Sequence, residues 1–288
     1  MKRTIVALMF AIPLGTSTVL AQSKPTFVFT AIPAQDETRL VQRFTRVAEF
    51  LHKKLGVDVK YLPVKSYPAA VTAFINGQVQ LAWFGGFTGV QARSRVEGSE
   101  AIAQGAEDVN FKSFFIANSK TGLQPAKDFP KGIAGKTFTF GSRSSTSGRL
   151  MPEFFIRKEF GKGPDEIFAR VGFSGNHSRT IQLVQSGAFE TGVLDYTVWQ
   201  LDDKAGKIDH SKVQVIWETP TFPDYQWTVR GGVDKTFGDG FKEKLRAALL
   251  SIDDPEIMKQ FGRSKFIAAK NSDYAPIAEV GKVTKLLN

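Results

Sequence analysis

Strand-like and helix-like hydrophobic patterns alternate along most of the chain. The run Thr26–Thr30 has the composition of a buried strand, and Glu37–Leu55 follows with apolar residues at helical spacing. The residues expected on one face of this helix are Leu40, Phe44, Val47, Ala48, Leu51 and Leu55. Val57–Leu62 is a second strand-like run. A strand, a helix and a strand within about 35 residues form a βαβ unit with parallel pairing, so the pattern predicts an α/β fold.

A shorter pattern occurs twice in the chain. Ala69–Gly77 is helix-like, ends on Asn-Gly and leads into the strand-like run Val79–Phe84. Arg179–Gly187 is helix-like, ends on Ser-Gly and leads into Phe189–Leu194. The candidate ligand groups just before these helices are Ser66, Tyr67, Asn176, His177 and Ser178. Two similar lobes that face one cleft would give this repeat, although helix–glycine–strand also occurs throughout α/β proteins.

The densest group of hydroxyls lies between a strand-like run and a helix-like run. Lys136–Phe140 leads into the turn Gly141–Gly148, and a helix is expected from Arg149. The hydroxyls of this turn are those of Ser142, Ser144, Ser145, Thr146 and Ser147. A helix N-terminus carries partial positive charge and free N–H groups, so hydroxyls placed there suit a small oxyanion. One hydroxyl would be enough for an ordinary N-cap, which is the alternative interpretation.

Residues 1–21 have the pattern of a secretory signal peptide. Lys2 and Arg3 precede the apolar run Ile5–Ile12, and Ala21 supplies a small residue for cleavage before Gln22. No later apolar stretch is long enough to cross a bilayer. The chain has no cysteine, which excludes both a disulfide framework and a lipid anchor on an N-terminal cysteine. We therefore expect a soluble, monomeric protein exported to the periplasm.

Composition argues against several other classes of function. The net charge is +10, but the basic residues are scattered and form no stripe interleaved with aromatics, so we expect no nucleic-acid partner. The three histidines are far apart and cysteine is absent, so no metal site is predicted. Gly-x-Ser-x-Gly is absent, and Gly132–Thr137 lacks the spacing of a phosphate-binding loop. We expect neither a cofactor nor an enzyme activity.

The length of 288 residues favours two lobes over a single core. Two apolar extended runs, Phe114–Ala117 and Val213–Trp217, are the expected crossings between the lobes. We assign residues 22–117 and 225–288 to lobe 1 and residues 118–224 to lobe 2. Two crossing segments would form a hinge about which the lobes close on a ligand.

Nearly the whole chain after the signal peptide resembles the periplasmic solute-binding proteins of phosphonate- and phosphite-type ABC importers. The matching segments are Ser66–Tyr67, Leu81–Gly85, Phe115–Asn118, Ser144–Gly148, Gly175–His177, Gly192–Asp195 and Asp253–Glu256. The resemblance implies a two-lobed, type II venus-flytrap fold with a two-strand hinge. It also implies capture of a small oxyanion and its delivery to an ABC permease in the inner membrane. The residues it implies as contacts for the ligand's oxygens are Tyr67, Ser145, Thr146, Ser147, His177 and Asp195, with Ser144 in the same turn.

The sequence departs from this family in one segment. Many members have Gly-Pro-x-x-Tyr after the second strand of the first lobe, whereas this chain has Gly85–Gly89 without the proline or the tyrosine. Thr88 is the hydroxyl expected to replace that tyrosine. Ile32–Thr38, taken with Trp83–Gly86 and Gly89–Arg93, resembles a branch assigned to selenate. Selenate is therefore the alternative ligand.

Asp195 offers a way to separate the candidate ligands. A carboxylate beside a fully deprotonated dianion is strongly repulsive in a dehydrated cleft. Phosphonate, phosphite and phosphate keep a proton near neutral pH, whereas selenate and sulfate do not. If Asp195 lines the pocket, it selects a protonated phosphorus oxyanion; otherwise it is a helix N-cap before Tyr196–Trp199. A secreted phosphoesterase and a sensory binding protein are the remaining alternatives for function.

Overall fold

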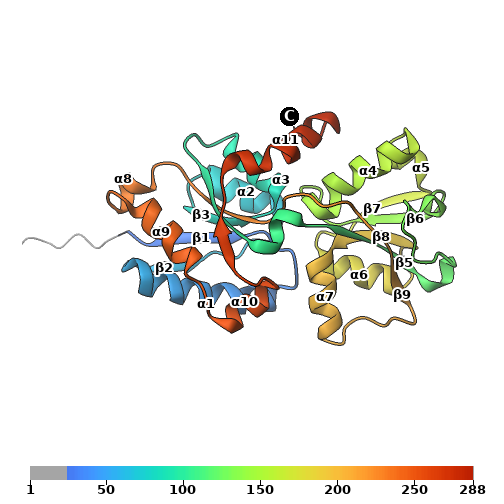
Figure 1. Ribbon diagram of the computed structural model, residues 1–288, viewed down its shortest axis with the longest axis horizontal. Coiled ribbons are helices and arrows are strands. Elements are labelled where there is room, and N and C mark those ends of the chain that lie inside the picture. The colour runs from blue at the N-terminus through green and yellow to red at the C-terminus, as the bar shows by residue number, and fades with distance from the viewer. Residues whose placement is uncertain (1–24, 288) are drawn as a thin grey trace, which may run out of the picture.

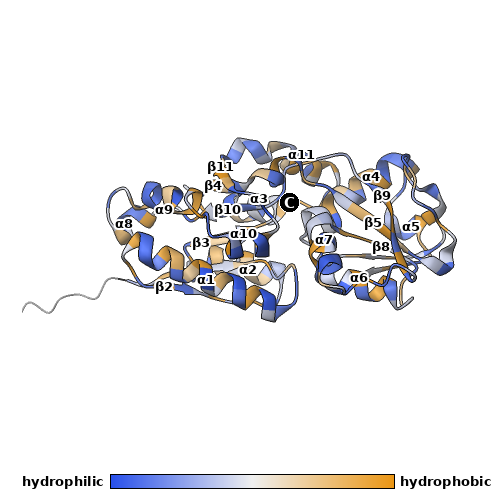
Figure 2. Cartoon of the chain, turned by 60° about the horizontal axis from the view of Figure 1, so that its bottom comes forward, coloured by the Kyte–Doolittle hydropathy of each residue, from blue (hydrophilic) through white to orange (hydrophobic). Residues whose placement is uncertain are grey.

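The computed structural model describes residues 25–287, so the predicted signal peptide, residues 1–21, lies outside the described residues. The chain forms two α/β lobes that lie side by side (Figure 1). Hydrophobic residues gather on the strands and on the helix faces that pack against them, and hydrophilic residues follow the outer faces (Figure 2). Within residues 25–287, no helix is both long enough and apolar enough to span a membrane.

The first lobe is built on a six-stranded mixed sheet in the order β11-β4-β10-β3-β1-β2. Its strands are β1 (Phe27–Ala31), β2 (Val59–Tyr61), β3 (Leu81–Phe84), β4 (Glu100–Gly105), β10 (Gln226–Val229) and β11 (Phe266–Ala268). β1 pairs in parallel with both β2 and β3, and α1 (Glu37–Leu55) connects β1 to β2. The predicted βαβ unit is thus confirmed, and all six apolar residues predicted on one face of α1 are buried.

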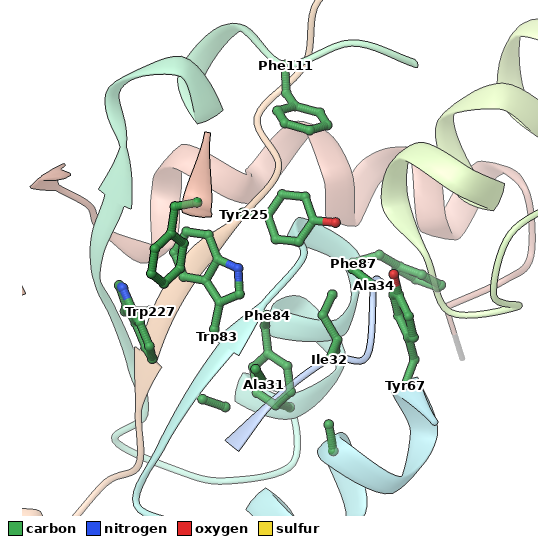
Figure 3. Close-up of a cluster of buried hydrophobic side chains, with 14 of the residues drawn as sticks. Ala31, Ile32, Ala34, Tyr67, Trp83, Phe84, Phe87, Phe111, Tyr225 and Trp227 are labelled. Carbon is green, nitrogen blue, oxygen red and sulfur yellow. The ribbon is translucent and has the colours of Figure 1, made fainter. Parts of the chain in front are cut away.

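After the second lobe, the chain returns to the sheet of the first lobe. β10 pairs with β3 and β4, and β11 pairs with β4. Trp83 and Trp227 face each other across the β3–β10 pair, with ring centroids 5.2 Å apart, inside an aromatic core (Figure 3). The other helices of this lobe are α2 (Tyr67–Ile75), α3 (Gly86–Arg93), α8 (Val233–Phe237), α9 (Phe241–Leu250), α10 (Pro255–Phe261), η5 (Asn271–Tyr274) and α11 (Ala275–Val283). η1 (Ala106–Asn110) lies on the segment that leads to the second lobe.

The second lobe is built on a five-stranded sheet in the order β7-β6-β8-β5-β9. Its strands are β5 (Ser113–Asn118), β6 (Thr137–Phe140), β7 (Arg170–Phe173), β8 (Thr191–Asp195) and β9 (Val213–Glu218). Its helices are η2 (Ser119–Thr121), η3 (Lys131–Ile133), η4 (Thr146–Leu150), α4 (Met151–Phe160), α5 (Pro164–Ile167), α6 (His177–Gln185) and α7 (Tyr196–Lys204). β6 pairs in parallel with β7 and β8, and β5 pairs antiparallel with β8 and β9.

The repeated pattern predicted from the sequence has the same place in both lobes. α2 begins at Tyr67 and leads to β3, and α6 begins at His177 and leads to β8. Each helix has a side-chain N-cap, Ser66 for α2 and Asn176 for α6, which accepts a hydrogen bond from an amide three residues later. The two helix starts therefore occupy equivalent positions and face each other across the interface between the lobes.

The hinge lies a few residues away from its predicted position. Phe114–Ala117 and Val213–Trp217 are parts of β5 and β9, which pair with each other inside the second sheet. The chain instead crosses through residues 106–112 and 219–225, where Phe111 and Phe222 exchange two backbone hydrogen bonds of 2.9 Å. Apolar extended residues suit a sheet core as well as a crossing strand, so composition alone did not separate the two.

Candidate functional site

Four helix N-termini meet at the interface between the lobes. α2 begins at Tyr67, α3 at Gly86, η4 (continued by α4) at Thr146 and α6 at His177. The Tyr67 hydroxyl lies 3.3 Å from Nε2 of His177, and the Phe87 amide donates to Oγ1 of Thr146 at 3.0 Å. These contacts bring the four helix starts together, so partial positive charge and polar hydrogens concentrate at one buried point.

The hydroxyls of the Ser145–Ser147 turn have three different tasks. Ser145 is the N-cap of η4, since its Oγ accepts from the Gly148 amide at 2.9 Å. Thr146 accepts the Phe87 amide from the other lobe. Ser147 Oγ is buried and has no hydrogen-bond partner within residues 25–287. The simple N-cap interpretation therefore explains Ser145 only, and the Ser147 hydroxyl is available for a ligand.

Gly148 allows the His177 ring to approach this turn. A Cβ atom at position 148 would lie 2.9 Å from Cε1 of His177 and 2.9 Å from Oγ of Ser145. It would also lie 3.2 Å from the Cα of Gly141, whose amide donates to the Gly148 carbonyl at 2.8 Å. The two glycines of the turn thus let strand, turn and histidine pack at a separation that a side chain would prevent.

His177 is a buried, neutral donor directed at Tyr67. The Asp195 amide donates to Nδ1 of His177 at 3.2 Å, so Nδ1 carries no proton and Nε2 holds the ring proton. Burial lowers the pKa of His177 despite the opposing effect of Asp195. The His177 amide also donates to the Ala34 carbonyl of the other lobe at 3.0 Å. The ring is therefore fixed in orientation and tautomer.

Tyr67 is fully buried and keeps its hydroxyl proton. Burial raises the pKa of Tyr67 above its usual value, and the Asp195 and Asp224 carboxyl groups raise it further. A protonated phenol can donate a hydrogen bond to an anionic oxygen. Tyr67 and His177 thus present one donor from each lobe to the same space.

Asp195 has the role of its predicted alternative, the helix N-cap. Its Oδ1 accepts from the Thr197 amide at 2.6 Å, the Thr197 hydroxyl at 2.7 Å and the Val198 amide at 3.2 Å. The side chain is 1% exposed and lies at the interface between the lobes. Its main-chain amide donates to His177 and so orients that ring.

Asp224 lies beside these helix N-termini and was not predicted from the sequence. It lies on the second crossing segment, is 1% exposed, and accepts the Gly86 amide on Oδ1 at 2.9 Å. Its Oδ2 is buried and has no partner within the described part of the chain. Burial raises the pKa of Asp224 to about 7, although hydrogen bonds from Thr146 and Gly86 act in the opposite direction. The carboxyl group therefore takes up and releases a proton near neutral pH.

Two predicted ligand residues lie apart from this group. Thr88 is buried in α3, where its hydroxyl donates to the Gly85 carbonyl at 3.1 Å. Ser144 is half-buried and lines a groove on the outer side of the turn, together with Pro68 and Leu286. The turn faces inward only from Ser145 onward, and Thr88 satisfies its own helix. Within residues 25–287, no cluster of histidine and carboxylate ligands suited to a metal ion is present.

Ion pairs connect the two lobes beside the site. Arg39 of α1 donates to Oδ1 of Asp202 in α7 at 2.5 Å, and the Ser178 hydroxyl donates to Oδ2 of the same carboxylate at 2.9 Å. Lys207 and Asp36 form a second pair between the lobes at 3.3 Å. Asp202 is 2% exposed, so its pairing with Arg39 favours the closed arrangement.

Replacing Arg39 by methionine is expected to weaken the binding of every ligand by a similar factor of about fivefold or more, because closure loses a partly buried ion pair between the lobes. The matched control is Lys65→Met, since Lys65 pairs with Glu37 on the exposed surface of a single lobe. Titration calorimetry gives the affinities, and small-angle scattering reports opening of the lobes. An Arg39→Met variant that binds all ligands like the wild type would show that this ion pair does not favour closure.

The sequence and the fold of the chain are similar to those of transport proteins. Residues 29–274 match a family described as the periplasmic substrate-binding protein of phosphonate ABC transporters. The chain is 39% identical over 259 residues to the probable ABC transporter phosphite binding protein PhnD1 of Prochlorococcus marinus (strain MIT 9301), covering 88% of this chain and 87% of that protein. The structure of PhnD1 in complex with methylphosphonate matches with a TM-score of 0.86 and 38% identity, covering 90% of this chain and 98% of that one.

A more distant structure supports the same architecture. The binding protein component of an ABC phosphonate transporter from Pseudomonas aeruginosa matches with a TM-score of 0.79 at 20% identity, covering 91% of this chain and 87% of that one. At this identity the likeness concerns the fold alone. The two-lobed α/β fold predicted from the sequence is confirmed.

Proposed function

The chain belongs to the periplasmic substrate-binding proteins of phosphonate ABC transporters, and from this premise we propose that it binds phosphite or a small phosphonate between Ser147, His177, Tyr67 and Asp224. The ligand is then passed to the membrane permease of the transporter. The single observation that carries the proposal is the pair of buried, unpartnered oxygens, Ser147 Oγ and Asp224 Oδ2, beside converging helix N-termini.

The site offers donors to a tetrahedral oxyanion. Ser147 and Tyr67 each bring one polar hydrogen, and the helix N-termini add a favourable field. The Nε2–H group of His177 donates to the Tyr67 oxygen and so leaves the Tyr67 hydrogen for the ligand. These groups come from both lobes. A ligand that contacts all of them favours the closed arrangement, which is the arrangement that the Phe87–Thr146 and His177–Ala34 hydrogen bonds also stabilise.

Proton sharing, which the sequence led us to expect at Asp195, is proposed here for Asp224. A carboxyl group with a pKa near 7 and a monoprotonated phosphorus oxyanion need only one proton between them, and either partner can supply it. Sulfate and selenate carry no proton at neutral pH, so Asp224 itself must take one up before they bind. The ligand preference of the site therefore follows from charge as well as from shape.

Ser147→Ala is the variant that tests this site. We expect a loss of about 10- to 100-fold in methylphosphonate affinity, because the variant removes a hydrogen bond to a charged group. Ser144→Ala is the matched control from the same turn, because its hydroxyl lies on the outer groove. Titration calorimetry gives the methylphosphonate affinities of both variants and of the wild type. If both serine variants bind equally well, the ligand does not lie at the inner face of the turn.

A further inference from the structure

A small chamber of about 20 Å³ lies between the lobes next to the proposed oxyanion site. The first lobe contributes Gln35 and Arg43 to its wall, the second lobe contributes Asp195, and Tyr225 of the crossing segment completes it. A cavity of this size holds one water-sized group.

Two buried donors of this chamber lack partners. Arg43 is 7% exposed and Gln35 is 3% exposed, yet Nε of Arg43 and Nε2 of Gln35 have no hydrogen-bond partner within residues 25–287. Nη2 of Arg43 donates to Oε1 of Gln35 at 2.5 Å, which fixes the amide so that its Nε2 is the free end. Unsatisfied buried donors are costly, so a group that accepts from them gains more than at an exposed position.

The charge on Arg43 persists in this position. Burial, together with the like charge of Arg263, lowers the pKa of Arg43 to about 10, so the guanidinium is charged at neutral pH. It lies over the ring of Phe261, 5.0 Å from the centroid. A cationic substituent in the chamber would therefore meet a fixed positive charge.

The opposite wall of the chamber supplies an acceptor. The three hydrogen bonds that the Asp195 carboxyl accepts within the described residues all go to Oδ1, and none goes to Oδ2. A carboxylate substituent in the chamber would be repelled by Asp195, and an ammonium substituent would be repelled by Arg43. A hydroxyl group satisfies both walls, since it accepts from Arg43 or Gln35 and donates to Asp195.

The chamber adjoins the proposed oxyanion site, because residues that line the chamber hold His177. Asp195 lines the chamber, and its amide binds the His177 ring. Ala34 lines the chamber, and its carbonyl accepts the His177 amide at 3.0 Å. In Figure 3 the hydroxyls of Tyr225 and Tyr67 point toward the same region beside Ile32, which also lines the chamber. A substituent on a phosphorus atom held at Ser147 and Tyr67 thus has the chamber within reach.

We propose that the chamber is a subsite for the substituent on phosphorus and selects a one-carbon substituent that bears a hydroxyl group. This inference rests on the proposed function and names its ligand class more narrowly. The preferred phosphonate is hydroxymethylphosphonate. Methylphosphonate lacks the hydroxyl, and 2-aminoethylphosphonate brings a longer, cationic substituent toward Arg43.

Titration calorimetry of the full mature protein with these three phosphonates and with phosphite tests the inference. We expect hydroxymethylphosphonate to bind about tenfold more tightly than methylphosphonate, and 2-aminoethylphosphonate to bind more weakly than either. Equal affinities for the hydroxymethyl and methyl compounds would overturn the subsite and leave the proposed function intact. Failure of all the phosphonates and of phosphite to bind would instead overturn the proposed function.

Variants identify the residues that are responsible for the preference for hydroxymethylphosphonate over methylphosphonate. Gln35→Met and Arg43→Met each remove donors from the chamber, so the ratio between hydroxymethylphosphonate and methylphosphonate should fall from about ten to near one. Gln42→Met is the matched control, because Gln42 lines the neighbouring surface groove and does not line the chamber. A ratio that persists in both donor variants would overturn the inference. The wild-type comparison decides the question even if a variant does not fold.

Discussion

Replacing Arg263 by methionine is expected to lower the free energy of unfolding by about 3–5 kcal/mol, because it leaves a buried carboxylate without its partner. Arg263 binds Asp108 through Nε at 3.0 Å and Nη2 at 2.6 Å, and the two side chains are 3% and 0% exposed. Burial opposes the charge on Arg263, but the attraction of Asp108 outweighs it and raises the pKa of Arg263. Asp108 lies on the first crossing segment, and its carbonyl accepts the Asp224 amide of the second at 3.0 Å. The pair therefore stabilises the hinge beside the site.

Urea denaturation at two pH values measures this effect. Burial raises the pKa of Asp108 to about 6, so the lone carboxyl group can take up a proton. The loss in Arg263→Met should accordingly be smaller at pH 5 than at pH 8, and a further Asp108→Asn substitution should recover part of it. The control is Arg246→Met, which breaks a partly exposed pair with Glu243 and should cost less than about 1 kcal/mol. A loss at Arg263 no larger than that of the control would contradict the account of the hinge.

Replacing Asp224 by asparagine is expected to change how stability depends on pH. The pKa of Asp224 is raised by burial from 3.8 to about 7, so the folded state holds this proton more tightly than the unfolded state does. Its contribution to stability is therefore complete at low pH and declines as the pH rises from about 4 to about 7, by up to about 1.4 kcal/mol per pH unit. Over the whole window the decline is on the order of 4 kcal/mol.

The measurement is the difference in unfolding free energy between wild type and Asp224→Asn at closely spaced pH values. Subtraction removes the contributions of His177 and Asp108, which titrate in both proteins. The unfolding free energy of the variant should rise steadily relative to that of the wild type from pH 4 to pH 7. Above pH 7 the difference should stay constant. A difference that does not vary with pH would show that Asp224 is charged throughout, and the proposed proton sharing would fail.

The sequence predicts those parts of the fold that are determined by residues close to one another along the chain. The apolar spacing of Glu37–Leu55 determines the buried face of α1 within one element. The Ser145–Ser147 turn follows β6 directly and begins a helix, so its position was predictable from local order. The pairing of Tyr67 with His177 was suggested by the repeated pattern, although the residues are 110 positions apart.

The role of Asp224 depends on distant contacts. Its carboxyl group meets the Gly86 amide 138 positions away, and nothing in the loop Thr219–Asp224 distinguishes that carboxyl from a turn residue. The hinge was misplaced for a related reason, since β5 and β9 have the apolar composition of a buried strand wherever such a strand lies. For Asp195, the local alternative of an N-cap proved to be the structural role.

Titration calorimetry of residues 22–288 at neutral pH against phosphite, methylphosphonate, phosphate, sulfate and selenate tests the central claim most directly. We predict tight, saturable binding of phosphite or methylphosphonate, with sulfate and selenate weaker because they bring no proton and bind only when Asp224 is itself protonated. Tight binding of selenate or sulfate, with the phosphorus ligands silent, would contradict it.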